Sequence, residues 1–92
     1  MGKNSEEFLL AADIVKRLKV KPNDEELKEL YGLFKQATVG DNNNDKPGFL
    51  DFQGQAKHTS WLKYKGLSTH DAEVNYITKV NELISLYGID QS

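Results

Sequence analysis

The sequence contains no cysteine, only two prolines and one tryptophan, and no long run of apolar residues. Without cysteine the fold can have neither a disulfide framework nor a thiolate metal site, and we expect a reducing intracellular compartment. No apolar run approaches the roughly 20 residues of a membrane span, and the N-terminus lacks the apolar core of a signal peptide. Met1-Gly2 begins like a myristoylation motif, but Glu6 stands where that motif has Ser or Thr. We therefore expect a cytoplasmic protein with no stably inserted membrane segment.

The charge is balanced, because 12 Lys and Arg face 14 Asp and Glu, for a net charge of −2. This balance argues against a nucleic-acid binder, which relies on a broad positive field. An anionic ligand would have to be met by cations gathered locally. Many acidic residues stand at expected helix starts, where they complement the helix dipole. A chain of 92 residues is expected to form one domain.

Apolar residues at steps of three and four predict two helices in the first half of the chain. Ser5 can cap the first helix, which we expect to end near Lys19. Its apolar positions are Phe8, Ala11, Ala12, Val15 and Leu18. Pro22 marks a break, after which Asn23 or Asp24 can cap the second helix. That helix carries Leu27, Leu30, Tyr31, Phe34 and Ala37 on one side.

The second half of the chain begins with a loop at residues 40–48, which contains three consecutive asparagines and a proline. We expect Phe49, Leu50 and Phe52 to return to apolar surroundings before a third helix at about residues 53–64. Ser68 and Asp71 have the form of a capping box for a fourth helix, which Gly88 would end. Since strand-type alternation is absent, the predicted class is an all-α four-helix bundle with a long second connection.

No set of residues has the pattern of a catalytic or metal centre. Ser68, His70 and Asp71 are too close in sequence to present the geometry of a triad, and Ser68 and Asp71 are better explained as helix caps. His58 and His70 lack a ligand partner three or four residues away, so we expect no zinc site. The residues therefore indicate a protein that is not an enzyme and has no metal.

Two pairs of an aromatic ring and a lysine have helical spacing. Tyr31 and Lys35 are four residues apart on the second helix, and Lys57 and Trp61 repeat the spacing on the third. Each pair can offer a flat surface for a base and a cation for a phosphate. Such pairs also occur on ordinary amphipathic helices, so the spacing alone leaves both interpretations open.

A set of short motifs gives the strongest indication of function. In order along the chain they are Gln36-Ala37-Thr38-Val39-Gly40-Asp41, Pro47-Gly48, Leu50-Asp51-Phe52, Ala56-Lys57, Trp61, Lys65-Gly66 and Tyr87-Gly88-Ile89. From Phe8 to Ile89 the chain resembles the acyl-CoA-binding protein family. The resemblance implies an up-down-down-up four-helix bundle, with residues 1–92 as a single acyl-CoA-binding domain.

The resemblance also implies a ligand and the residues that hold it. The ligand is one CoA ester of a medium- or long-chain fatty acid per monomer, with no cofactor. Tyr31 corresponds to the residue that packs on adenine, and Lys35 and Lys57 to residues that take the ribose phosphate. Ala12, Lys16 and Tyr76 fall where family members touch the ligand, and Phe34 stands where a tyrosine is usual. The implied role is an intracellular acyl-CoA carrier and pool former that makes transient contact with acyl-CoA-using enzymes or membranes.

Several residues depart from the family pattern. Phe34 keeps a ring but lacks the usual hydroxyl, while Lys28, Gln53 and His58 should make the rim of the groove more polar. Two other functions remain open. A helical interaction module would bind a partner helix between the second and third helices, and a thioesterase would need a nucleophile set that the sequence lacks.

Overall fold

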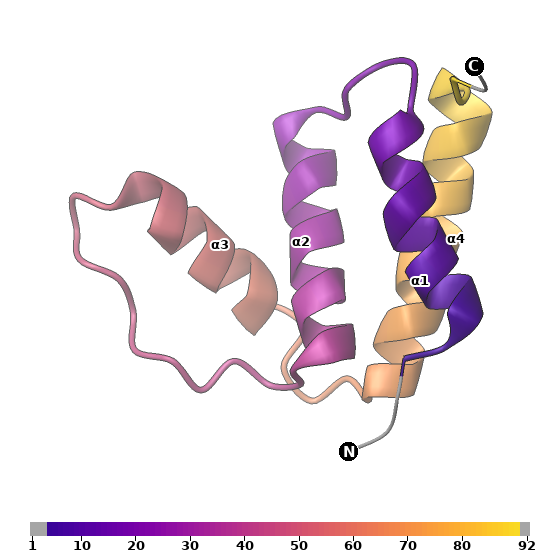
Figure 1. Cartoon of the computed structure of the whole chain (residues 1–92). Helices are drawn as coiled ribbons and strands as arrows, with labels where there is room; N and C mark the ends of the chain where they lie inside the picture. The colour runs from indigo at the N-terminus through magenta and orange to yellow at the C-terminus, as the bar shows by residue number, and fades with distance from the viewer. Residues whose placement is uncertain (1–3, 91–92) are drawn as a thin grey trace.

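The computed structural model describes residues 4–90 (Figure 1), so Met1-Gly2 and the outer ends of the predicted domain lie outside the described part. Over residues 4–90 the chain forms four α-helices, one short 3-10 turn and no strand: α1 Glu6–Ile14, the turn Val15–Arg17, α2 Asp24–Thr38, α3 Phe52–Leu62 and α4 Thr69–Tyr87. In the view of Figure 1, α1 runs up, α2 and α3 run down, and α4 runs up again. The expected all-α, up-down-down-up arrangement is confirmed.

Each α-helix begins at a side chain that can accept a hydrogen bond from a free backbone amide of the first turn. The capping residues are Ser5, Asn23, Asp51 and Ser68. At α2 the cap is reciprocal, because Asn23 Oδ1 accepts from the Glu26 amide at 2.8 Å and the Glu26 carboxylate accepts from the Asn23 amide at 2.9 Å. Ser68 accepts from the Asp71 amide at 3.0 Å, which is one of the two bonds of the predicted capping box. Gly88 ends α4 in a left-handed conformation with φ 76°, which favours glycine.

The α-helical part of α1 is shorter than the sequence predicted. It ends at Ile14 and continues only as the 3-10 turn to Arg17. Leu18 is extended and pairs antiparallel with Ile89, and the Lys19 amide donates to the Gly88 carbonyl at 2.9 Å. Because these backbone groups bond to the segment that follows α4, the helix cannot run on to Lys19.

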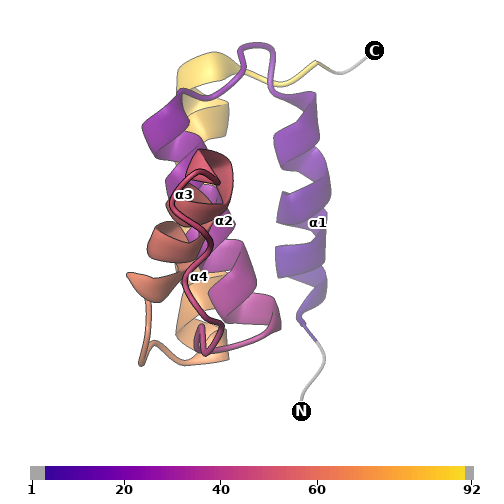
Figure 2. The same ribbon diagram turned by 90° about the vertical axis from the view of Figure 1, so that its left-hand side faces the viewer.

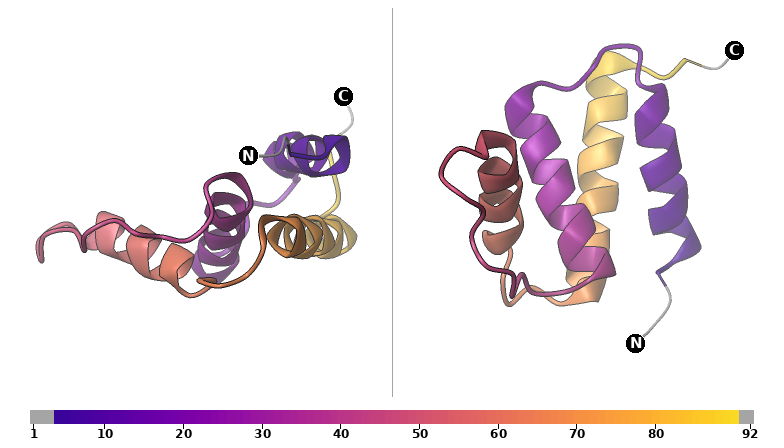
Figure 3. Two further views of the ribbon diagram at one scale, coloured as in Figure 1. Left: turned by 90° about the horizontal axis from the view of Figure 1, so that it is seen from below. Right: turned by 60° about the vertical axis from the view of Figure 1, so that its left-hand side comes forward.

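The helices form two structurally different regions. α4 packs against both α1 and α2, and α3 packs on the side of α2 that faces away from α4 (Figures 2 and 3). We call α1, α2 and α4 the three-helix layer and residues 39–62 the α3 arm. The buried core lies in the three-helix layer and consists of Phe8, Ala11, Leu30, Leu33, Ala37, Ala72, Tyr76, Val80 and Leu83. α3 contributes one buried residue, Trp61.

The structure contradicts the prediction for the residues that lead into α3. Phe49, Leu50 and Phe52 were expected in apolar surroundings, but they are 80%, 72% and 73% exposed. The physical reason is that the loop carries this segment to the outer end of α3, away from α1 and α4 (Figure 1). No apolar surface of the described chain covers these side chains there.

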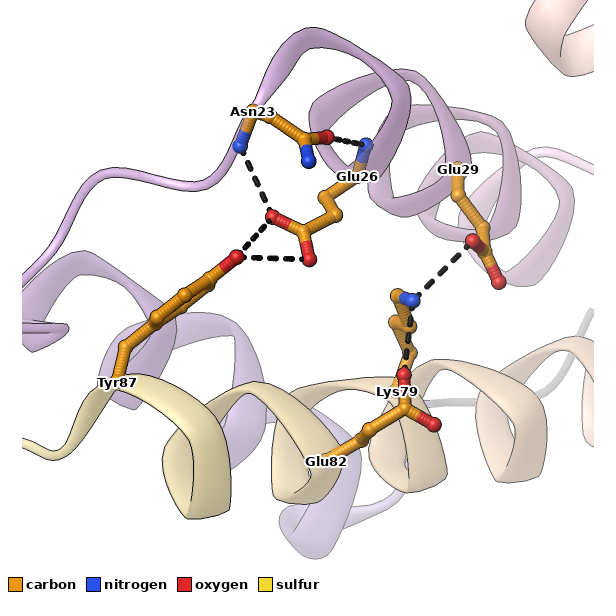
Figure 4. A network of polar contacts seen from close by, with 6 residues as sticks. All are labelled: Asn23, Glu26, Glu29, Lys79, Glu82 and Tyr87. Atoms are coloured by element: carbon orange, nitrogen blue, oxygen red, sulfur yellow. Dashed lines mark hydrogen bonds and ion pairs between the residues drawn. The ribbon is translucent and has the colours of Figure 1, made fainter.

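Polar contacts join α2 to α4 along the solvent side (Figure 4). The Tyr87 hydroxyl lies 2.8 and 3.0 Å from the two carboxylate oxygens of Glu26. The amide of Asn23 and this hydroxyl both donate to Glu26, and they hold the pKa of its carboxyl below the ordinary value. Lys79 lies 3.4 Å from Glu29 and 2.9 Å from Glu82. The N-terminal half of α2 is thus fixed on the last turns of α4.

Candidate functional site

A groove of about 900 Å³ lies over α2, between α1 and α3. Its lining residues are Leu9, Ala12, Asp13, Val15, Lys16, Pro22, Asp24, Leu27, Lys28, Leu30, Tyr31, Phe34, Gln53, Ala56, Lys57, Ser60 and Tyr76. Ligand sites for small organic molecules typically have volumes of about 300–1,000 Å³. The groove is therefore large enough for a cofactor-sized molecule.

Three helices contribute to the groove with one repeated spacing. α1 and the 3-10 turn that follows it supply residues 9, 12, 13 and 16, α2 supplies residues 24, 27, 28 and 31, and α3 supplies residues 53, 56, 57 and 60. Steps of three, four and seven residues place side chains on one face of a helix. One face of each of the three helices thus looks into a common space.

The floor of the groove is apolar and aromatic. Phe34 lies stacked against Phe8 with ring centres 5.7 Å apart, and its ring centre is 6.0 Å from that of Tyr76. Tyr76 is buried, which raises the pKa of its hydroxyl, so this group stays neutral. Leu27, at 36% exposed, and Leu30 extend the apolar surface along α2. A long apolar chain can be sheltered here from water.

Three lysines and two aspartates line the groove around this floor. Asp13 is 3.4 Å from Arg17 and Lys28 is 3.7 Å from Glu25. Over residues 4–90 this leaves Lys16 and Lys57 without a carboxylate partner, against Asp24. Lys57 Nζ lies 5.6 Å from the centre of the Tyr31 ring, within the range of a cation–π contact. The arrangement combines an apolar floor, an aromatic face and local positive charge, which suits an anionic amphiphile.

The aromatic and lysine pairs seen in the sequence exchange partners in three dimensions. Lys57 lies over Tyr31, and Lys35 Nζ lies 5.0 Å from the centre of the Trp61 ring. Each contact joins α2 to α3 in the same order along both helices, because the two helices run parallel. Trp61 is only 6% exposed, and its Nε1 donates to the Gly40 carbonyl at 2.7 Å. The expectation that Trp61 offers a flat surface to a ligand is therefore wrong.

The structure brings most of the sequence-predicted site residues together. Six of the seven line the groove: Ala12, Lys16, Tyr31, Phe34, Lys57 and Tyr76. Lys35 is not among the lining residues, because its side chain extends over Trp61. Lys28 and Gln53 line the groove as expected for a more polar rim. His58 does not, since its Nε2 is 3.0 Å from the Asn44 carbonyl, where it anchors the loop.

Some lining residues were missed by the sequence reasoning. Leu9 and Asp13 share a helical stripe with Ala12 and Lys16, and Ser60 shares one with Lys57. This spacing was available in the sequence and could have identified them. These residues were not identified because the same helices also carry a stripe that faces the core. The spacing of apolar residues does not distinguish a stripe that lines a groove from one that faces a core.

No group that could hold a metal ion accompanies the groove in the described part of the chain. Over residues 4–90, no three His, Cys, Asp or Glu side chains are grouped so that they could hold a metal ion. Ser68 and Asp71 serve as a helix start. None of the helices between Asn4 and Asp90 is both long and apolar enough to cross a membrane.

The sequence is similar to named relatives along most of its length. Residues 5–80 match the family model described as Acyl CoA binding protein. Acyl-CoA-binding protein homolog 1 of Caenorhabditis elegans is 53% identical over 78 residues, which cover 85% of this chain and 91% of the relative. The acyl-CoA-binding protein homolog of Drosophila melanogaster is 51% identical over 83 residues, covering 90% of this chain and 96% of the relative.

Solved structures share the fold. The crystal structure of Oryza sativa Acyl-CoA-Binding Protein 2 has a TM-score of 0.84 at 37% identity and covers 88% of both chains. The solution structure of Acyl Coenzyme A Binding Protein from yeast has a TM-score of 0.72 at 45% identity, covering 91% of this chain and 98% of that one. Both similarities extend over most of the chain.

Proposed function

Because this chain belongs to the acyl-CoA-binding protein family, we propose that it binds medium- or long-chain fatty acyl-CoA one-to-one as an intracellular carrier. Proteins of this family are binding proteins, and acyl-CoA is their ligand. The observation that carries the proposal is the groove, in which an apolar floor and several lysines meet in one space of about 900 Å³. An acyl-CoA has the matching chemistry, with a long apolar tail on a phosphorylated nucleotide.

In the proposed complex the nucleotide lies toward α2 and α3. Tyr31 stacks on the adenine, a contact worth roughly 1–3 kcal/mol per base in nucleic-acid systems. Lys57, which now covers the Tyr31 ring, turns its ammonium to the ribose phosphate, and Lys35 joins it by leaving Trp61. Charge-assisted hydrogen bonds to phosphate are stronger than neutral ones, which makes this exchange of partners favourable.

The acyl tail lies over the apolar floor. Ala12 leaves room on α1 for the chain, and Phe34 and Tyr76 provide ring surface beneath it. Lys16 approaches the polar end of the ligand from the 3-10 turn after α1. Each methylene that leaves water contributes about 0.8 kcal/mol, so a dozen sheltered methylenes outweigh one or two lysine contacts at about 1.5–3 kcal/mol each. The nucleotide then fixes identity and orientation, and the tail sets affinity.

We also propose that the chain forms a single domain that works as a monomer. The family match ends at residue 80, yet the last turn of α4 is tied to α2 through Tyr87 and Glu26, and Ile89 pairs with Leu18. These contacts support one folding unit that reaches at least Asp90.

Calorimetric titration with palmitoyl-CoA, free CoA and free palmitate in parallel tests the proposal. We expect tight one-to-one binding of the ester and much weaker binding of either fragment, because one groove holds both ends. Two more carbons in the tail should tighten binding by up to roughly tenfold until the groove is full. If none of the three ligands binds, or if prolonged incubation with palmitoyl-CoA releases free thiol, the carrier function is contradicted.

A further inference from the structure

Three large apolar side chains stand exposed at the outer end of the α3 arm. Phe49, Leu50 and Phe52, which we call the tip patch, are each more than two-thirds exposed. In two views at right angles, the segment between the loop and α3 lies at the edge of the molecule farthest from α1 and α4 (Figures 1 and 3). Single exposed apolar residues are ordinary. Three of them within four positions, at the outer end of the α3 arm, form a contiguous patch of the kind that marks an interaction site.

The tip patch is continuous with the groove along α3. Phe52 is followed directly by Gln53, which lines the groove. Phe52 and Ala56 are four residues apart on one face of α3, and Ala56 also lines the groove. An apolar partner seated on the tip patch would therefore stand at the mouth of the groove.

The size of the tip patch argues against a stable protein interface. A large side chain has a surface of roughly 150–250 Å², and these three are about three-quarters exposed, so together they expose on the order of 450 Å². A stable protein partner needs about 800 Å² on each side. A lipid bilayer needs no such area, since a few apolar side chains can dip into the headgroup boundary for a brief, reversible contact.

The charges around the tip patch favour a contact made by apolar insertion. Asp51 turns its carboxylate to the Gly54 amide at 2.9 Å, where it caps α3. Asp45 and Lys46 precede the patch and offset each other in sign. Because no cluster of cations adjoins the tip patch in the sequence, we expect its contact with a bilayer not to depend on anionic lipids.

We propose that Phe49, Leu50 and Phe52 dock the protein on the surface of a lipid bilayer, with the mouth of the groove beside the membrane. The role of this contact rests on the proposed function, because an acyl tail long enough to fill the groove also inserts into a bilayer. Docking lets the tail pass between bilayer and groove without crossing open water. The contact itself exists without ligand and can be tested separately.

The first experiment measures co-sedimentation of the ligand-free protein with small phosphatidylcholine vesicles. The tip variant carries Phe49→Ser, Leu50→Ser and Phe52→Gln, and the control variant carries Leu10→Gln, Val20→Ser and Leu86→Gln, three exposed apolar residues outside the α3 arm. We expect the tip variant to lower vesicle partitioning by about tenfold or more and the control to stay within about twofold of wild type. Added salt should leave wild-type partitioning unchanged.

Equal partitioning of all three proteins, or a larger loss in the control variant, would overturn the proposal. So would a wild-type dimer in sedimentation velocity that the tip substitutions dissociate, because the patch would then cover a second copy of the chain. Circular dichroism verifies that each variant is folded.

A second measurement does not depend on the triple variant. Phe49→Trp should show a blue-shifted emission with phosphatidylcholine vesicles and quenching by brominated lipid, against the constant signal of buried Trp61. Leu86→Trp, exposed on α4, is the matched control and should show neither change. An unshifted and unquenched signal from Phe49→Trp would overturn the proposal.

Solution binding of palmitoyl-CoA separates a failure of this inference from a failure of the proposed function. The tip variant should bind palmitoyl-CoA added without vesicles within about twofold of wild type, because none of its three residues lines the groove. It should nevertheless take palmitoyl-CoA from vesicles more slowly. If wild type binds no palmitoyl-CoA, the proposed function fails, while the vesicle result still decides whether the tip patch contacts lipid.

Discussion

The three-helix layer and the α3 arm are held together by different physics. In the layer, buried apolar side chains such as Phe8, Val80 and Leu83 lie between α1, α2 and α4. The arm contacts α2 through cation–π pairs, and its own loop is fixed to α3 by the Trp61 bond to Gly40 and the Asn42 bond to the His58 carbonyl at 3.1 Å. Since burial of apolar surface is the main source of stability, the layer should be the rigid part and the arm the adjustable one. The groove lies where the two meet.

The largest effect should come from a cavity in the layer. Leu83 is fully buried on α4 and does not line the groove. Leu83→Ala should lower the free energy of unfolding by about 2–5 kcal/mol, out of a total of about 5–15 kcal/mol for a domain. Urea unfolding measures this loss. Leu86→Ala, on the same helix but exposed, should change the free energy of unfolding by less than about 1 kcal/mol. Similar losses in both variants would contradict the claim that apolar burial in the three-helix layer provides most of the stability.

The contact between the three-helix layer and the α3 arm can be weakened by a substitution at Gly32. A Cβ at this position would overlap the Ser60 carbonyl oxygen and the Tyr64 ring, so α2 and α3 approach closely only because glycine stands there. Gly32→Ala should therefore push α3 away, at a cost of about 1–3 kcal/mol, and weaken palmitoyl-CoA binding more than Leu83→Ala does under conditions where both variants are folded. Gly48→Ala is the control, because a Cβ there meets open space. An unchanged affinity of Gly32→Ala for palmitoyl-CoA would show that binding does not depend on the close approach of α2 and α3.

The polar side of the site can be tested with two lysines that lie at the same distance from a tyrosine ring. Lys57 and Lys63 each have Nζ 5.6 Å from a tyrosine ring centre, but only Lys57 lines the groove. Lys57→Ala should weaken palmitoyl-CoA binding by about tenfold or more, and Lys63→Ala should have little effect. Lys35→Ala should resemble Lys57→Ala if Lys35 leaves Trp61 for the ligand. Calorimetry gives the affinities, and equal losses at Lys57 and Lys63 would remove Lys57 from the proposed phosphate contact.

The smallest effect concerns the contact between Tyr87 and Glu26. The Glu26 carboxyl has its pKa held below the ordinary 4.5 by the Asn23 amide and then the Tyr87 hydroxyl. A lowered pKa contributes stability above about 4.5, and this contribution disappears as the pH falls through the pKa of the folded state. Tyr87→Phe should therefore narrow the difference in stability between neutral and acid conditions. Urea unfolding at neutral and at acid pH measures this difference in the free energy of unfolding, with Tyr64→Phe as the comparison. If Tyr87→Phe leaves the pH dependence of stability unchanged, the Tyr87 hydroxyl does not lower the pKa of Glu26.

The sequence predicted the layer well because its signals are local. Ser68 and Gly88 mark the two ends of α4 through backbone groups within a few residues, and the apolar stripe between them faces one side. The early end of α1 was not predictable in this way. It depends on Lys19 bonding to Gly88, far along the chain, which overrides a helix-compatible local sequence.

The arm was predicted less well because its contacts are not local. Phe49, Leu50 and Phe52 have the composition of a core segment, but their exposure is decided by where the loop ends. In the groove, the spacing of Tyr31, Lys35, Lys57 and Trp61 indicated the helices involved but not the contacts between them, in which Lys57 lies over Tyr31 and Lys35 over Trp61. Side-chain partners across helices depend on the direction and register of packing, which spacing within one helix does not contain.

Amide hydrogen exchange with and without palmitoyl-CoA tests most directly whether the ligand ties the α3 arm to the three-helix layer. Without ligand, we predict fast exchange in α3 and slow exchange in the core-facing part of α4, because local stability follows apolar burial. With saturating ligand, exchange should slow most in α3 and in the first half of α2, while the second half of α4 stays unchanged. Saturation that leaves the exchange of α3 unaltered would contradict a site between the two regions.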